Sequence, residues 1–295
     1  MTEIQIRPWK NLMVSASDGA IIAGAEWSGS RGPLVCIHGI TSQSRAFVGL
    51  ASELADYKIL AIDCRGRGDS SKRSPFGLRQ HAADVVAAMD SVGVDRAVLV
   101  GHSMGAYVAS AVTSEYPERV ESVIFIDGGF WRDYPLTMSP DELLDLRLGP
   151  FLAKFRRRWN SIDEYLDYYR NTPVYPTGID AYGRVHFEYD LAKLDNKLVA
   201  KISEECVRTD WRDVVDHDTV GKRLEQVRVP ALLLTAPQGL TGTGDEVITP
   251  RVRAELELRI PQLRTVEIPD SNHHTILLSK AGASTVANEI AAFAG

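Results

Sequence analysis

Short, almost wholly apolar runs alternate with helix-length amphipathic stretches along most of this chain. A hairpin is expected over 12–17 and 21–27, and the single apolar runs that follow it lie at 33–37, 58–62, 98–100, 123–126, 231–234 and 265–268. Continuous apolar runs are typical of strands covered on both faces, and strands that alternate with helices form mostly parallel sheets. The pattern predicts an α/β fold with an eight-stranded, mostly parallel sheet and helices on both faces.

The alternation stops after the run at 123–126, and helical patterns fill roughly the next 100 residues. We expect this insertion, residues 130–228, to form a helical cap over the carboxyl ends of the strands. Residues 1–129 and 229–295 would then form the α/β core. The insertion is rich in aromatic side chains, among them Trp131, Phe151, Phe155, Trp159, Tyr168 and Tyr169.

Two helix starts inside the insertion carry the capping-box pattern, Ser139 with Glu142 and Ser161 with Glu164. The basic cluster at 154–159, Lys-Phe-Arg-Arg-Arg-Trp, lies between them. Charge runs are usually solvated helix faces. We therefore expect this cluster to face solvent, with a contact to an anion or a partner as the alternative.

Composition excludes several classes of protein. The chain has 295 residues, 44% of them hydrophobic and 24% charged, which suits a folded globular protein and argues against disorder. A net charge of −6 disfavours nucleic acid as a partner. No apolar run approaches the ~18 residues of a membrane span, and the N-terminal residues lack a signal pattern, so we expect a cytoplasmic protein. Three scattered cysteines indicate neither a disulfide framework nor a metal site.

The segment Gly101–Gly105 follows an apolar run and precedes a helical pattern. A serine presented on a sharp strand-to-helix turn is the nucleophile of Gly-x-Ser-x-Gly hydrolases, so Ser103 is the candidate nucleophile. Serine needs a base to take its proton. Of the seven histidines, His273 is the best placed because it lies just beyond the last strand, and the adjacent His274 competes with it.

Acyl transfer also needs two backbone N–H groups that stabilise the negative oxygen of the tetrahedral intermediate. One is expected from Met104, directly after the nucleophile. The other is expected from the turn at 38–41, with Ile40 as the donor, because the preceding Gly39 lets the backbone bend.

These motifs together resemble the α/β-hydrolase superfamily, and within it the serine hydrolases that carry a helical cap. The resemblance covers nearly the whole length of the chain, and the segments that carry it are His38-Gly39, Asp63 to Ser70, Gly101 to Gly105 and Ile268-Pro269 ahead of His273. It implies a catalytic triad of serine, histidine and an acid.

Two aspartates compete as the acid that orients His273. Asp245 precedes His273 by a segment that resembles the usual acid-to-histidine stretch of the family, but a long glycine-rich lead separates it from its strand. Asp127 directly follows the strand at 123–126, a placement similar to that in haloalkane dehalogenases and certain lactone hydrolases. An acid that fixes a histidine tautomer gains from a rigid mount, which favours Asp127, whereas the resemblance of the segment before His273 favours Asp245. Both alternatives therefore stay open.

We expect hydrolysis of a carboxylic ester or lactone through an acyl-enzyme, without a cofactor or a metal. The aromatic insertion favours a moderately bulky apolar small molecule as substrate, with Trp131 as a wall of its pocket. Two alternatives are a carbon–carbon bond hydrolase of the meta-cleavage type and a non-catalytic small-molecule receptor on the same fold. Formation of a homo-oligomer is left open.

Overall fold

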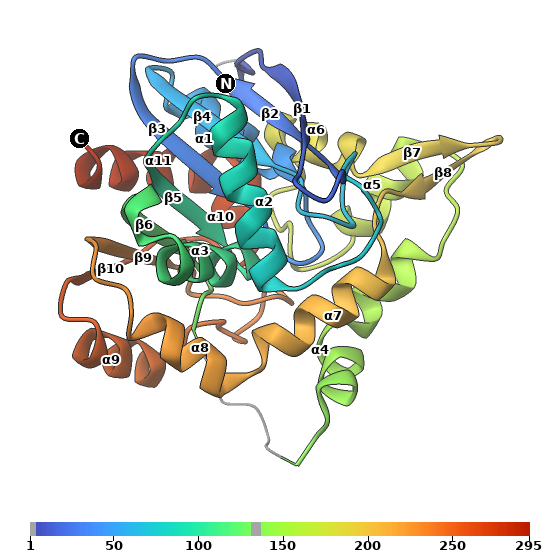
Figure 1. Ribbon diagram of the computed structural model, residues 1–295. Helices are drawn as coiled ribbons and strands as arrows, with labels where there is room; N and C mark the ends of the chain where they lie inside the picture. Colours follow the sequence, from blue (N-terminus) through green and yellow to red (C-terminus); the bar gives the residue numbers. More distant parts are fainter. Residues whose placement is uncertain (1–3, 131–136) are drawn as a thin grey trace.

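The structure is a computed structural model that describes residues 4–130 and 137–295 (Figure 1). Its centre is an eight-stranded sheet in the order β1-β2-β4-β3-β5-β6-β9-β10. The β1–β2 and β2–β4 pairs are antiparallel, and every other pair in the sheet is parallel. The mostly parallel eight-stranded sheet predicted from the apolar runs is therefore confirmed.

The sheet strands are β1 (Lys10–Ser15), β2 (Ile21–Trp27), β3 (Arg31–Ile37), β4 (Tyr57–Ile62), β5 (Ala97–His102), β6 (Val120–Ile126), β9 (Ala231–Thr235) and β10 (Leu263–Glu267). The helices outside the insertion are η1 (Ser44–Phe47), α1 (Val48–Glu53), α2 (Leu78–Ser91), α3 (Met104–Glu115), η2 (Pro117–Arg119), α9 (Pro250–Arg259), α10 (Thr275–Leu278) and α11 (Lys280–Phe293). The short helices η1, α1 and α10 carry no long apolar period and were not predicted.

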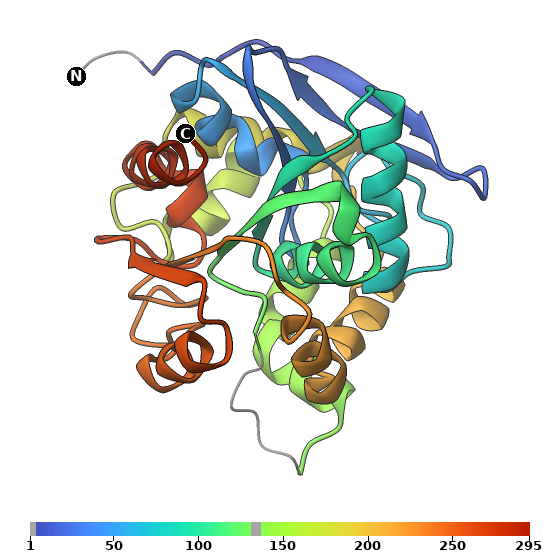
Figure 2. The ribbon, with the colours of Figure 1, turned by 60° about the vertical axis from the view of Figure 1, so that its left-hand side comes forward.

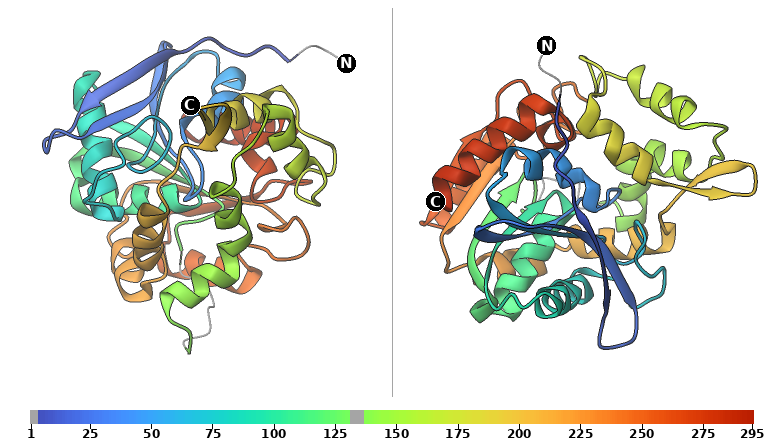
Figure 3. Two further views of the ribbon diagram at one scale, coloured as in Figure 1. Left: turned by 90° about the vertical axis from the view of Figure 1, so that its right-hand side faces the viewer. Right: turned by 90° about the horizontal axis from the view of Figure 1, so that it is seen from above.

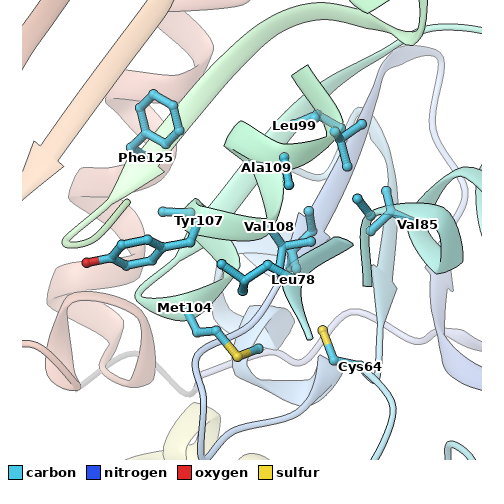
Figure 4. Packing of buried hydrophobic residues seen from close by; sticks show 14 of the residues in the cluster. Cys64, Leu78, Val85, Leu99, Met104, Tyr107, Val108, Ala109 and Phe125 are labelled. Atoms are coloured by element: carbon cyan, nitrogen blue, oxygen red, sulfur yellow. The ribbon is translucent and has the colours of Figure 1, made fainter. Parts of the chain in front are cut away.

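Helices cover both faces of the sheet, which explains why its central strands are apolar without alternation (Figure 2). Val35 and Ile37 of β3 pack into one hydrophobic cluster with α2 and α3, while Leu34 and Cys36 pack into the other with α1 and α11. Figure 4 shows the first cluster, where side chains of α2 and α3 meet Leu99 of β5. The two-sided burial holds the carboxyl ends of the strands rigidly.

In its described part, from residue 137 onward, the segment between β6 and β9 adds no strand to the eight-stranded sheet. Its described elements are α4 (Pro140–Phe155), α5 (Ile162–Arg170), α6 (Ala181–Tyr189), β7 (Leu191–Leu194), β8 (Lys197–Ala200), α7 (Glu204–Val214) and α8 (His217–Leu224). The β7–β8 hairpin, which projects from the body, was not predicted (Figure 3). Leu144 of α4 and Trp211 of α7 belong to the same hydrophobic cluster as α2 and α3, so the insertion shares the core of the sheet.

The two capping boxes differ. Ser139 Oγ accepts the Glu142 N–H, and the Glu142 carboxylate accepts the Ser139 N–H at 2.8 Å, which completes the first box. Ser161 Oγ accepts the Glu164 N–H, but the Glu164 carboxylate binds the N–H of Asn160 instead. The second box is therefore only half formed, because a neighbouring N–H competes for the carboxylate.

None of the helices within residues 4–130 and 137–295 combines the length and the apolar character that crossing a bilayer requires.

Candidate active site

Ser103 lies at a sharp turn between β5 and α3, with φ 53° and ψ −119°. A non-glycine residue at positive φ is strained and needs support from its surroundings. The glycines of the elbow allow the close packing that supplies it: a Cβ on Gly105 would lie 1.9 Å from the carbonyl oxygen of Ile37. Gly128 is equally confined, since its Cβ would lie 2.5 Å from the Ser103 carbonyl oxygen.

His273 joins Ser103 to Asp127. Its Nε2 lies 2.9 Å from Ser103 Oγ, and its Nδ1 lies 2.6 Å from Asp127 Oδ2. The tautomer with the proton on Nδ1 satisfies both contacts, because it donates to the carboxylate and accepts from the hydroxyl. The structure thus brings together the predicted nucleophile, the predicted base and one of the two candidate acids.

Asp127 has a rigid mount at the end of β6. Its N–H donates to Leu234 O at 2.8 Å, and its Oδ1 accepts the Ala236 N–H at 3.2 Å. Its side chain is fully buried, so its second carboxylate oxygen is presented to His273 in a fixed direction.

Asp245, the other candidate acid, does not contact His273. Its carboxylate accepts the Thr241 N–H at 3.1 Å, within the glycine-rich loop that follows β9. Because this loop closes on itself, the carboxylate is turned to its own backbone. Of the two candidate acids, the structure places Asp127 and not Asp245 beside His273.

The loop that carries His273 is tied down at several points. Asn272 Oδ1 accepts the N–H groups of His274 and Thr275, and Asn272 Nδ2 donates to Val174 O of the insertion at 2.7 Å. His102 Nε2 donates to the His273 carbonyl oxygen at 2.9 Å. Burial lowers the pKa of His102 well below its usual value, so this imidazole is neutral.

His274, the competing base, faces another part of the same cavity. Its ring stacks on Phe151 at 5.7 Å between centroids, and its buried Nε2 has no hydrogen-bond partner among the described residues. Burial lowers the pKa of His274 well below its usual value. Because His273 and not His274 contacts Ser103, His274 is a residue of the cavity wall.

The turn after β3 lies against the serine. A Cβ on Gly39 would be 3.1 Å from Ser103 Cβ, so the backbone approaches closely. His38 Nε2 accepts the Cys64 N–H at 2.9 Å, which places its proton on Nδ1, and Nδ1 then donates to Gly39 O at 2.7 Å. Since a trans peptide points its N–H opposite to its C=O, this contact fixes the direction of the Ile40 N–H.

Arg67 braces the next peptide of this turn. Its Nε donates to Ile40 O at 2.9 Å, and its Nη2 lies 3.6 Å from Met104 Sδ. Ile40 and Met104 both line the cavity beside Ser103. Among the hydrogen bonds of the described ranges, none is donated by the backbone N–H of either residue. Both groups therefore remain available for a ligand.

A cavity opens at the carboxyl ends of the strands, between the sheet and the insertion. From the sheet side it is lined by Gly39, Ile40, Ser103, Met104, Asp127, His273 and His274, among others. From the insertion it is lined by Leu148, Phe151, Lys154, Tyr169, Tyr175, His186, Phe187, Asp190, Trp211 and Val214. Most of the insertion side is aromatic or aliphatic, which suits a small organic ligand.

The basic cluster at 154–159 is not wholly solvated. Arg156 and Arg157 follow the end of α4, are exposed as expected of solvated side chains, and pair with Glu204 and Glu164. Lys154, however, is only 6% exposed and lines the cavity. The expectation of a solvated face is wrong for this residue, because α4 turns that side toward the sheet.

A chain of hydroxyl groups leads away from Lys154. Its Nζ donates to Tyr169 Oη, which lies 3.1 Å from Tyr165 Oη, and Tyr165 Oη donates to Asp190 Oδ2 at 3.1 Å. Gln43 Nε2 donates to Asp190 Oδ1 at 3.1 Å and so ties the insertion to the sheet side. Sequence reasoning missed these polar residues.

Trp131, the predicted pocket wall, lies outside the described residues. The tryptophan found in the cavity wall is Trp211 of α7, whose indole N–H donates to Pro140 O at 2.8 Å. Trp159 is instead buried beside Tyr165 and Tyr168 in the core of the insertion.

His81, Cys206 and Asp210 each bring one possible ligand atom to within 4.8 Å of the others. Arg67 occupies this cluster, since its Nη1 donates to Cys206 Sγ at 2.7 Å and also to the Asp210 carboxylate. His81 Nε2 lies 2.9 Å from the same carboxylate oxygen. A guanidinium there repels a cation, so the cluster is an ion-pair network that joins the turn after β4 to α7.

Comparison with known proteins identifies the fold family of this chain. The family model described as the alpha/beta hydrolase fold matches residues 32–280. The structure of E-2-(acetamidomethylene)succinate hydrolase has a TM-score of 0.79 at 23% identity, over 97% of this chain and 99% of that one.

Two curated relatives carry different activities in their names. Lipase 1 of Psychrobacter immobilis is 26% identical over 247 residues, which are 82% of this chain and 71% of that protein. The 2-hydroxy-6-oxononadienedioate/2-hydroxy-6-oxononatrienedioate hydrolase of Paraburkholderia phymatum is 29% identical over 187 residues, 61% of this chain and 59% of that protein. The family match extends over most of the chain and includes the elbow, His273 and Asp127, and the chain therefore belongs to the alpha/beta hydrolase fold family and is a hydrolase of that superfamily.

Proposed function

We propose that this protein is a serine hydrolase that cleaves a carboxylic ester or lactone of a small molecule through an acyl-enzyme. The observation that carries the proposal is the contact of His273 with Ser103 Oγ at 2.9 Å and with Asp127 Oδ2 at 2.6 Å. This is the geometry that nucleophilic catalysis by serine requires: nucleophile, base and orienting carboxylate in one hydrogen-bonded line.

In this mechanism Ser103 Oγ attacks the acyl carbon while its proton passes to His273 Nε2. Asp127 holds the imidazole in the reactive tautomer and stabilises the imidazolium that forms. As the tetrahedral intermediate collapses, the proton passes to the leaving alkoxide. Water then attacks the acyl-enzyme with His273 as the base, which releases the acid and restores Ser103.

The oxyanion is proposed to bind the backbone N–H groups of Ile40 and Met104. Two observations support this assignment of the donors: the direction of the Gly39–Ile40 peptide is fixed, and Ile40 and Met104 both lie beside Ser103. Preorganised donors of this kind contribute about 3 to 4 kcal/mol each to stabilisation of the transition state. Residues 130–228 are proposed to form the cap that closes the cavity over these groups.

A carbon–carbon bond hydrolase of the meta-cleavage type is a second candidate. It is favoured by the polar groups of the insertion, because such a substrate carries an acid that needs a cation such as Lys154. The same serine and histidine would serve both reactions, so the nature of the scissile bond has to come from experiment.

The test combines covalent labelling with turnover. A fluorophosphonate probe should label wild-type protein and fail to label Ser103→Ala. Ser114→Ala is the matched control, because Ser114 lies on the same helix α3 but is partly exposed and bonds Gln226. Turnover is followed with p-nitrophenyl esters and with a lactone panel in a pH-indicator assay.

Labelling that depends on Ser103, together with turnover of an ester or lactone, supports the proposal. Labelling without turnover of either class would favour the carbon–carbon hydrolase or a receptor without catalysis. An absence of labelling in wild-type protein would contradict a reactive serine altogether.

A further inference from the structure

Lys154 of α4 is a cation enclosed in the same cavity as Ser103. It is 6% exposed, and its Nζ lies 5.2 Å from the ring centroid of Phe151, 4.8 Å from that of Phe155 and 4.4 Å from that of Tyr169. Removing an ammonium group from water costs free energy, which hydrogen bonds and the faces of aromatic rings offset in part. Such a costly arrangement calls for a function.

The ammonium group keeps donors that no described protein atom uses. An ammonium has three N–H groups, and the hydrogen bonds of the described residues give Lys154 a single acceptor, Tyr169 Oη. The aromatic rings stabilise the charge through their faces but accept no strong hydrogen bond. Two donors are therefore left for a molecule in the cavity.

Two other buried cations of this protein, Arg65 and Arg67, pair directly with a carboxylate. Arg65 contacts Asp84 at 2.7 Å, and Arg67 contacts Asp210. Lys154 has no ion pair within the described residues, and it reaches Asp190 only through the hydroxyl groups of two tyrosines. Asp190 in turn is already bonded by Gln43 and Tyr165.

We infer that Lys154 binds a carboxylate of the substrate, on a part of the molecule remote from the scissile bond. The inference rests on the proposed function and narrows its substrate class to acyl compounds that carry a free acid group. A carboxylate fits better than a phosphate, because a single ammonium balances one negative charge and the nearby Asp190 opposes a second. The aromatic and aliphatic lining would then hold the carbon chain between the acid and the acyl group.

The first experiment compares two esters that differ only at the remote end, mono-p-nitrophenyl glutarate and its neutral methyl ester. For wild-type protein kcat/KM should be higher for the acid than for the methyl ester. In Lys154→Met the ratio of the two kcat/KM values should fall about 10- to 100-fold, the usual effect of losing a charge-assisted hydrogen bond. Lys193→Met is the matched control, because Lys193 is exposed on the hairpin, and it should keep the wild-type ratio.

A second experiment does not depend on catalysis. Titration calorimetry on Ser103→Ala should show binding of monomethyl glutarate and at least tenfold weaker binding of dimethyl glutarate. Adding Lys154→Met should remove this preference. Circular dichroism establishes that both variants are folded.

The outcomes separate the two proposals. An equal loss for both esters in Lys154→Met, or equal binding of the acid and the diester by Ser103→Ala, would overturn the anion site. If wild-type protein hydrolyses neither ester but Ser103→Ala still prefers the acid through Lys154, the anion site stands and the proposed hydrolysis fails.

Discussion

The two walls of the cavity are built differently. On the sheet side, Ser103 and Asp127 stand on turns that follow the buried strands β5 and β6, His273 follows the edge strand β10, and these three side chains have partners inside the protein. On the insertion side, Lys154 faces the same cavity with hydrogen-bonding capacity that no described residue uses, and His274, where the two walls meet, also has an unused Nε2. His274 belongs to the sheet side by sequence, but it contacts Phe151 of α4.

The difference separates chemistry from recognition. A matched and rigid set of partners favours a reaction that is the same for every substrate, because preorganisation lowers the barrier without depending on the rest of the molecule. Unmatched donors on the opposite wall instead discriminate between ligands, since a ligand lacking the complementary group leaves them unsatisfied. Variants on each wall should therefore have effects of different kinds.

The largest effect is expected from Asp127→Asn. The amide cannot hold the His273 proton on Nδ1, so kcat should fall about 10³- to 10⁴-fold toward any hydrolysed ester. Asp245→Asn is the control, because its carboxylate contacts only its own loop, and its kcat should stay within about twofold of wild type. Steady-state kinetics on both variants decide the comparison, and a larger loss in Asp245→Asn would contradict the structure.

Loss of the guanidinium that ties the turn after β4 to α7 should have the next largest effect. Arg67→Met leaves the buried Asp210 carboxylate without its main partner, which should lower the free energy of unfolding by about 3 to 5 kcal/mol. Arg157→Met removes an exposed pair with Glu164 and should cost at most about 1 kcal/mol. Urea denaturation measures the free energy of unfolding of both variants. Similar losses would show that the buried network contributes no more to stability than an exposed ion pair.

Lys154→Met should change stability in the opposite direction. Burial lowers the pKa of Lys154 from 10.5 to about 8, which corresponds to a cost of about 3 kcal/mol for keeping the amine charged in the folded protein near pH 7. Met removes that cost at similar length, so the free energy of unfolding at pH 7 should rise by about 1 to 3 kcal/mol. A residue that serves packing alone would give a loss instead.

The elements and the reactive residues differ in how far local sequence determines them. The strands and the elbow at Ser103 could be predicted because apolar runs and the Gly-x-Ser-x-Gly spacing are local signals. The choice between Asp127 and Asp245 was not local, since it depends on β6 lying between β5 and β9 and on the path of the loop after β9. The sequence shows Asp127 directly after its strand and Asp245 beyond a long glycine-rich lead, and it leaves this choice open.

Lys154 could not be recognised from the basic cluster, because the cluster runs across the end of α4, with Lys154 inside the helix and the arginines beyond it. A usable signal was its spacing: Lys154 follows Phe151 by three residues and so borders the apolar stripe of α4, whereas Arg156 and Arg157 lie beyond the end of that helix. A charged side chain beside an apolar stripe indicates that the side chain is buried or binds a ligand, rather than that it faces solvent. Only the packing of α4 over the cavity distinguishes these outcomes.

The smallest effect, and the finest comparison of the walls, concerns pH. Because the pKa of Lys154 is about 8, its ammonium is charged below that pH and neutral above it, so preference for the acid ester should decline as pH rises through about 8. Burial raises the pKa values of Tyr169 and Tyr165 and lowers those of His186 and His274, so these neighbouring groups do not change their state in this range.

Stability should follow the reverse trend. The folded protein binds fewer protons at Lys154 than the unfolded chain between about pH 8 and 10.5, so this residue adds to the free energy of unfolding as pH rises through that window. The advantage of Lys154→Met over wild type should therefore shrink above pH 8, together with the selectivity of the wild type for the acid ester. Kinetics and urea denaturation of wild-type protein and Lys154→Met at pH 7 and 9 test both trends. A wild-type selectivity that stays constant across this range would show that the ammonium does not bind the acid.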